Sequence, residues 1–85
     1  MLDLQTSDVV ENILLDAVRE YESSMGRQLA IATFRYPGHG RSELDRIMAT
    51  ALRNYENTTG AKLQNVVFSY ERPEFGIPRY ACDAR

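Results

Sequence analysis

Residues 17–36 read AVREYESSMGRQLAIATFRY, and residues 51–70 read ALRNYENTTGAKLQNVVFSY. Aligned without a gap at an offset of 34, the two stretches share eight of their twenty residues. Unrelated stretches of this length share roughly one or two at ordinary residue frequencies. Self-similarity at a fixed period is the sequence signature of a repeated structural unit. We therefore expect a tandem duplication of one 34-residue helix–strand unit.

Each copy begins with the pattern of an amphipathic helix. Ser7 or Asp8 is the expected N-cap of the first helix, and Ser42, with Asp45 three residues later, is that of the second. Apolar residues then recur at the helical period and predict one buried stripe per helix: Val9, Val10, Ile13, Leu14, Ala17, Val18 and Tyr21 in the first, and Leu44, Ile47, Met48, Ala51, Leu52 and Tyr55 in the second.

Each helix is expected to end at a glycine and to be followed by a strand. Gly26 and Gly60 suit a left-handed C-cap, which glycine adopts without steric cost. Residues 29–36 and 62–70 then alternate in polarity, which is typical of strands. The face toward the helices is expected to carry two matched aromatic pairs: Phe34 and Tyr36, and Phe68 and Tyr70. The opposite face is expected to carry four aliphatic residues: Leu29, Ile31, Leu63 and Val67.

The element order is therefore α-β-α-β, which predicts an α/β fold with two helices on one face of a small sheet. Repeat one covers residues 8–36 and repeat two residues 42–70, within one domain at 1–70. The connection between the strands, about 25 residues with a helix, permits a parallel pair, and an antiparallel pair is also possible. Residues 71–85 contain Pro73 and Pro78, which are unfavourable in a central strand, and are expected to be a tail that packs on the domain or on a partner.

A sheet of two strands is only marginally stable in water, so its second face and its edges need a cover. Pairing with a second copy would extend the sheet to four strands, and on this argument we expect a homodimer. The alternative is that the tail folds over the sheet and covers it with Phe75, Ile77 and Tyr80.

Composition excludes several classes of function. Cys82 is the only cysteine and His39 the only histidine, so no intrachain disulfide, zinc cluster or Ser-His-Asp triad is expected. No cofactor and no metal site is predicted, and the absence of a catalytic constellation predicts that the chain is not an enzyme. No apolar run reaches the roughly 18–20 residues of a membrane span. The acidic N-terminus lacks the basic flank of a signal peptide, so a cytoplasmic location is expected.

Charge is distributed unevenly along the chain. Residues 1–25 carry six acids and one arginine, whereas residues 26–53 carry five arginines and two acids. The acidic first helix could face a basic partner, with Leu15 and Asp16, which lie off the apolar stripe, as contact residues. The leading hypothesis is a small non-enzymatic protein-interaction module that regulates or inhibits a partner protein. Such a chain also suits an inhibitor from a phage or mobile element.

The loop YPGHGRSE, residues 36–43, suggests an alternative function. It leaves a strand and enters a helix, whose free amides attract anions. His39, Arg41 and Ser42 could contact a phosphate there, with Arg35 nearby. The glycine spacing matches neither a Walker motif nor a dinucleotide fingerprint. A phosphate- or nucleic-acid-binding module is therefore the second hypothesis.

Overall fold

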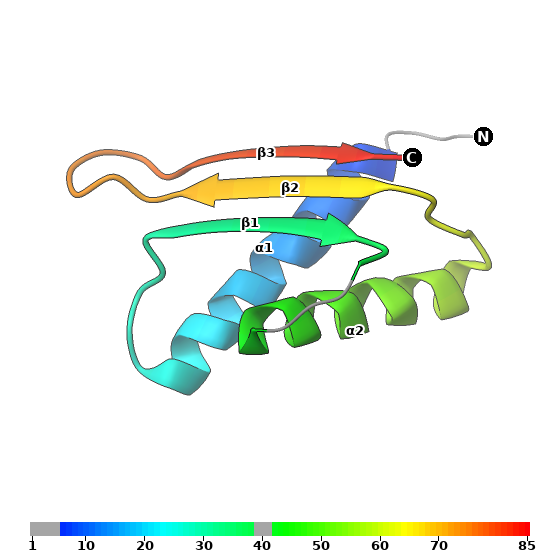
Figure 1. Ribbon diagram of the computed structural model, residues 1–85, viewed down its shortest axis with the longest axis horizontal. Coiled ribbons are helices and arrows are strands. Elements are labelled where there is room, and N and C mark those ends of the chain that lie inside the picture. Colours follow the sequence, from blue (N-terminus) through cyan, green and yellow to red (C-terminus); the bar gives the residue numbers. More distant parts are fainter. Residues whose placement is uncertain (1–5, 39–41) are drawn as a thin grey trace.

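The computed structural model describes residues 6–38 and 42–85. Its elements follow in the order α1 (Thr6–Met25), β1 (Ile31–Tyr36), α2 (Glu43–Thr59), β2 (Val66–Glu71) and β3 (Arg79–Ala84). The strands form one antiparallel sheet in the order β1-β2-β3, and both helices lie on the same face of it (Figure 1). The α/β class is borne out in this form, as a helical layer on an antiparallel sheet. The other face of the sheet, which we call the bare face, is covered by no helix or strand among the described residues.

The second helix begins and ends at the predicted capping residues. The Ser42 hydroxyl oxygen accepts a hydrogen bond from the amide of Asp45 at 3.1 Å. Gly60 adopts a left-handed φ of 78°, and its amide donates to the carbonyl of Glu56 at 2.8 Å. These contacts satisfy backbone groups that a helix end otherwise leaves without a partner.

The first helix ends as predicted but begins earlier. Gly26 has a φ of 73°, and its amide donates to the carbonyl of Glu22 at 2.9 Å. The prediction that Ser7 or Asp8 caps the helix is wrong, because α1 begins at Thr6 and both residues lie in its first turn. Asp8 still favours the helix there, since an acidic group near the N-terminus offsets the positive end of the helix dipole.

Both strands begin later than predicted, and this changes the face on which two leucines lie. Leu29 and Leu63 were expected on the bare face, but Leu63 is buried and Leu29 is half-buried against the core. The amide of Leu29 donates to a carboxylate oxygen of Glu22 at 2.9 Å, and that of Leu63 to Glu56 at 2.7 Å. These bonds hold each leucine against its helix before the strand begins.

The pairing of β1 with β2 is antiparallel, which decides between the two arrangements that the spacing permits. Phe34 lies directly opposite Phe68. The two residues are 34 positions apart, which is also the offset between the two similar stretches. Equivalent residues of the two strands therefore lie at equal distances on either side of this pair. The register relates β1 and β2 by a local two-fold axis through Phe34 and Phe68.

The core lies between the sheet and the two helices. The four aromatic residues predicted to face the helices are all buried, and Phe68 is completely so. Of the predicted helical stripes, Val9 is an exception because 42% of its surface is exposed. The rest of the buried core is supplied by the helices, by the segment before β2 and by the first residue of β2: Val10, Leu14, Ala17, Val18, Leu44, Met48, Leu52, Leu63 and Val66.

The third strand comes from the segment that was expected to be a tail. β3 follows both prolines and pairs with β2 as an edge strand, with Cys82 opposite Phe68. The alternative in which the tail covers the sheet is wrong, because Phe75 and Ile77 are 87% and 83% exposed. Leu15, which lies off the predicted apolar stripe of the first helix, is not fully exposed. β3 packs on α1, so Leu15 is half-buried against the core.

Candidate protein-interaction surface

Of the residues predicted to bind a partner or an anion, the four that the structure describes lie on different elements. Leu15 and Asp16 lie on α1, in the helical layer, whereas Arg35 alternates with the buried β1 aromatics and so lies on the bare face. Ser42 caps α2 through its hydroxyl oxygen. His39 and Arg41 lie outside the described residues.

The charges around these residues are partly paired. The carboxylate of Asp16 lies 3.4 Å from the guanidinium of Arg19, and both side chains are largely exposed. The first turn of α2 carries Glu43 and Asp45, whose negative charges oppose an anion at that helix end. These two acids therefore weaken the attraction of this helix start for a phosphate.

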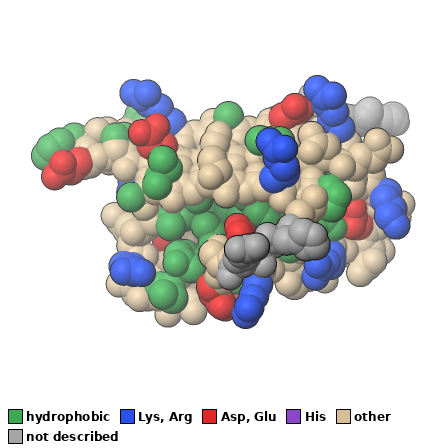
Figure 2. Space-filling view, viewed as in Figure 1, with side chains coloured by type: hydrophobic (Ala, Val, Ile, Leu, Met, Phe, Trp, Pro, Cys, Tyr) green, Lys and Arg blue, Asp and Glu red, His purple; other side chains and the backbone are tan. Residues whose placement is uncertain are grey.

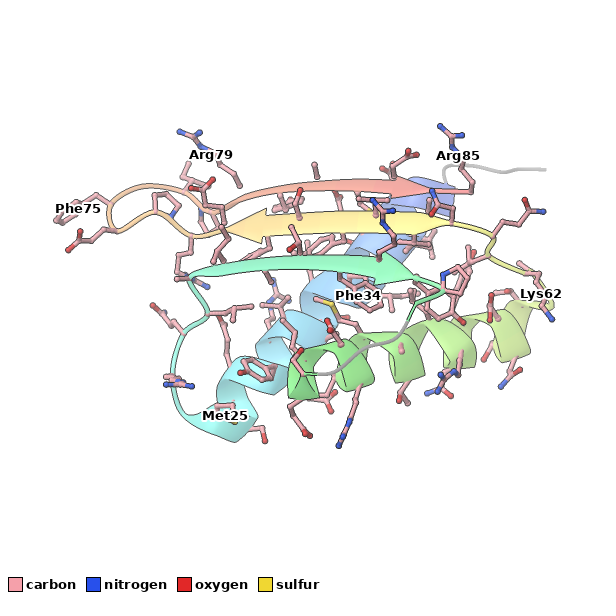
Figure 3. The ribbon with its side chains drawn as sticks, in the orientation of Figure 1. Met25, Phe34, Lys62, Phe75, Arg79 and Arg85 are labelled. Carbon is pink, nitrogen blue, oxygen red and sulfur yellow. The ribbon has the colours of Figure 1, made fainter. Side chains whose placement is uncertain are left out.

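Exposed apolar side chains gather instead at one end of the sheet. β1 begins at this end, β2 ends there and β3 begins there, since Ile31 lies opposite Glu71 and Glu71 opposite Arg79. The connection from β2 to β3 projects beyond the body, with Phe75 at its outer end (Figure 3). Figure 2 shows apolar and acidic side chains at this projecting end. We call the following residues, with their exposed fractions, the hairpin surface: Ile31 (67%), Phe75 (87%), Ile77 (83%) and Tyr80 (48%).

The backbone of the connection is restricted in its conformations. Pro73 and Pro78 stand on either side of the two exposed residues, and each fixes its own φ. Gly76, between Phe75 and Ile77, has a φ of 117°, which a residue with a side chain rarely adopts. The connection therefore turns at a glycine and presents its apolar side chains outward. Single exposed apolar residues are common on protein surfaces, but Phe75 and Ile77 lie only two residues apart on the same projecting connection, and larger exposed apolar groups are typical of binding surfaces.

A shallow depression of about 240 Å³ lies on the bare face next to this hairpin. Ile31, Glu71 and Arg79 line it at the hairpin end, and Thr33, Ser69 and Ala81 line it further along the strands. The small side chains of these last three residues, which lie opposite one another in the register, explain the hollow.

A second depression, of about 190 Å³, lies between α1 and the base of the hairpin. In it the guanidinium of Arg72 lies 3.3 Å from the carboxylate of Glu22 and 5.9 Å from the ring centre of Tyr70. The Nε atom of Arg72 is buried and has no hydrogen-bond partner among the described residues. This ion pair ties the hairpin to the helical layer.

Glu22 and Glu56 recur at equivalent positions of the two stretches, and both carboxylates are engaged in the structure. Beyond its bond to Leu63, Glu56 accepts a hydrogen bond from the Tyr36 hydroxyl at 3.0 Å. Burial, and then this carboxylate, raise the pKa of Tyr36 above its ordinary value. The two glutamates therefore serve the fold by holding backbone and side-chain donors.

The remaining reactive group, the thiol of Cys82, is half-buried. Burial, and then the negative charges of Glu11 and Asp83, together raise its pKa to about 11. The thiol is therefore protonated at neutral pH and is a poor nucleophile or metal ligand. Among the described residues no group of three His, Cys, Asp or Glu side chains is placed to hold a metal ion. Neither described helix combines the length and the apolar character that a membrane span requires.

Comparison of the chain with models of protein families, with curated proteins and with solved structures finds no match.

Proposed function

We propose that this chain is a small, non-enzymatic protein-interaction module that regulates or inhibits a partner protein, which it binds through the hairpin surface. The observation that carries the proposal is the exposure of Phe75 and Ile77, at 87% and 83%, on a connection that projects from the body. Side chains of this size gain free energy when they leave water, at about 1.5–3 kcal/mol for full burial of each. Their burial in a pocket of a partner would supply an anchor of the kind that dominates protein interfaces.

The chemistry of the other groups supports a binding role over catalysis. Glu22 and Glu56 are occupied by backbone amides, and the Cys82 thiol has a raised pKa. Residues 71–79, which include the connection between β2 and β3, carry two acids and two arginines, Glu71, Arg72, Glu74 and Arg79, so the net charge of this segment is zero. We therefore expect the partner to present an apolar pocket rather than a strongly charged surface.

A variant with Phe75→Ser and Ile77→Ser tests this proposal. Wild-type bait is expected to capture a partner from the native host, and the double variant to lose it while keeping its free energy of unfolding within about 0.5 kcal/mol, because both side chains are exposed. Val9→Ser is the matched control, since Val9 is an exposed apolar residue near the start of α1. A photo-crosslinking residue at position 75 should attach to the same partner. Equal capture by all three baits, or no crosslink from position 75, would overturn the proposal.

We also infer that the two halves of the chain arose by tandem duplication. The support is that the shared residues have matching roles. Glu22 and Glu56 each hold the amide of a leucine seven residues later, and Gly26 and Gly60 each end a helix with a positive φ. Matched substitutions in the two halves test the inference, because equivalent residues should have similar effects on stability.

A further inference from the structure

The hydrogen bonds of β1 leave one of its edges open. The amide of Arg72 donates to the carbonyl of Ala30 at 2.7 Å, so this pair is hydrogen-bonded. Such pairs alternate along an antiparallel ladder, so every second residue from Ala30 onward directs its backbone groups toward β2. The residues between them direct their amides and carbonyls away from the sheet, where the described chain offers them no partner: Ile31, Thr33 and Arg35.

The two edges of the sheet differ in protection. β3 carries Arg79 and Asp83 and is preceded by Pro78. Charged residues and prolines at an edge strand disfavour pairing with another chain. β1 carries a single charged residue, Arg35, near its end. β1 is therefore the edge at which another strand is more readily added.

The sequence of β1 is complementary to itself about Thr33. If Thr33 lies opposite Thr33 of a second, antiparallel copy, Phe34 lies opposite Ala32 and Tyr36 opposite Ala30 on the helix side. Each large ring then lies beside a small side chain. The same combination occurs at the other edge, where Phe68 lies opposite Cys82.

The charges of β1 also permit this register. Arg35 of one copy would lie opposite Ile31 of the other, so no like charges are placed opposite each other. Thr33 opposite Thr33 is a cross-strand pair that can form a side-chain hydrogen bond. We propose that the open edge of β1 pairs with the same edge of a second copy of this chain, which joins the two sheets into one of six strands.

The size of the contact sets the strength of this dimer. An edge of one short strand buries less than the roughly 800 Å² per partner of a standard stable interface. The dimer is therefore weak and depends on concentration. Phe75 and Ile77 lie on the connection between the other two strands, so the protein-binding role and the dimer can fail independently.

Sedimentation and hydrogen exchange test the dimer directly. Between about 10 μM and 1 mM the mass is expected to rise from 9.7 kDa toward twice that value. Over the same range the amides of Ile31, Thr33 and Arg35 should become protected, while that of Phe34 is protected throughout. A constant mass of 9.7 kDa, or protection that does not follow this alternation, would overturn the proposal.

Three substitutions at position 33 separate edge pairing from other association. Thr33→Pro removes an outward amide that makes no bond within the described chain, so it should abolish the dimer, whereas Thr33→Val keeps the amide and should retain the dimer.

In a Cys82→Ala background, Thr33→Cys should form a covalent dimer on oxidation, since hydrogen-bonded antiparallel pairs have the Cα spacing that a disulfide needs. Val67→Cys, on the bare face of the central strand, should not. This comparison holds even if the proline variant fails to fold, and equal crosslinking at positions 33 and 67 contradicts edge pairing.

Discussion

At the scale of single residues, one carboxylate near the C-terminal end of each helix accepts a hydrogen bond from the backbone segment that follows. Glu56 accepts hydrogen bonds from the Leu63 amide and the Tyr36 hydroxyl, and all three groups are at least partly buried. Glu56→Ala leaves both donors without their partner and is expected to lower the free energy of unfolding by about 2 kcal/mol. Glu22→Ala should have a similar effect, since its carboxylate holds the Leu29 amide and Arg72. Urea denaturation measures both.

The exposed neighbour Asn57 provides the control for this prediction. Asn57→Ala removes a side chain at the same helix end and should change the free energy of unfolding by no more than about 0.5 kcal/mol. A Glu56→Ala effect as small as that of Asn57→Ala would show that the carboxylate does not hold the strand entry.

The thiol of Cys82 gives a prediction in pH. Its pKa is about 11 in the folded chain, against an ordinary value of 9.0, so the thiolate fraction at pH 8 is about 100-fold lower than in the unfolded chain. Alkylation by iodoacetamide at pH 8 should be slower by about that factor in the absence of urea. Equal rates in the folded and the unfolded chain would contradict the burial of this group.

The same group affects stability at high pH. The folded chain holds the thiol proton more tightly than the unfolded chain, so this contribution to stability is complete below pH 9.0 and is lost as the pH rises toward about 11. Cys82→Ala should therefore show a smaller decline in unfolding free energy over this range. The decline that remains in the variant includes that of Tyr36, whose pKa is also raised. An unchanged decline would show that Cys82 does not contribute to it.

At the scale of elements, the packing of β3 on α1 explains why Leu15 is half-buried although it lies off the apolar stripe of α1. Leu15→Ala is expected to lower the free energy of unfolding by about 1–2 kcal/mol, because the side chain packs on the core under β3 only in part. Val9→Ala on the same helix should have an effect below about 0.5 kcal/mol, since Val9 is 42% exposed. Equal effects at the two positions would indicate that β3 does not cover this flank.

Local signals in the sequence predicted the start of α2, the C-terminal ends of both helices and the buried aromatic face of the strands. The capping by Ser42, the positive φ of Gly26 and Gly60 and the burial of the aromatic residues all follow from steric and hydrogen-bonding rules that act within a few residues. The antiparallel pairing was not predictable, because a connection of this length suits either direction. β3 was missed because the prolines of residues 71–85 are turn signals, and in the structure they precede the strand.

At the scale of the whole molecule, the bare face and the hairpin surface result from how the layers are arranged. The sequence offered Phe75, Ile77 and Tyr80 as one possible cover for the sheet, but it could not show that the β2–β3 connection projects beyond the sheet. The predicted loop site was inferred from residue types and from its place between a strand and a helix, and the helix that follows begins with a capping serine and two acids. The hairpin surface is a property of the assembled sheet, and no local pattern reveals it.

The local two-fold relation and the open edge of β1 both follow from the register that places Phe34 opposite Phe68. The most direct measurement is the nuclear Overhauser effect between α-protons across the sheet. In this register Thr33 lies opposite Ser69 as a non-hydrogen-bonded pair, in which the two Cα atoms are about 4.5 Å apart, so a strong cross-peak between their α-protons is expected. A slip of one residue would place the Phe34 ring on the bare face. A Thr33 α-proton that instead contacts that of Phe68 or Tyr70 would contradict the account.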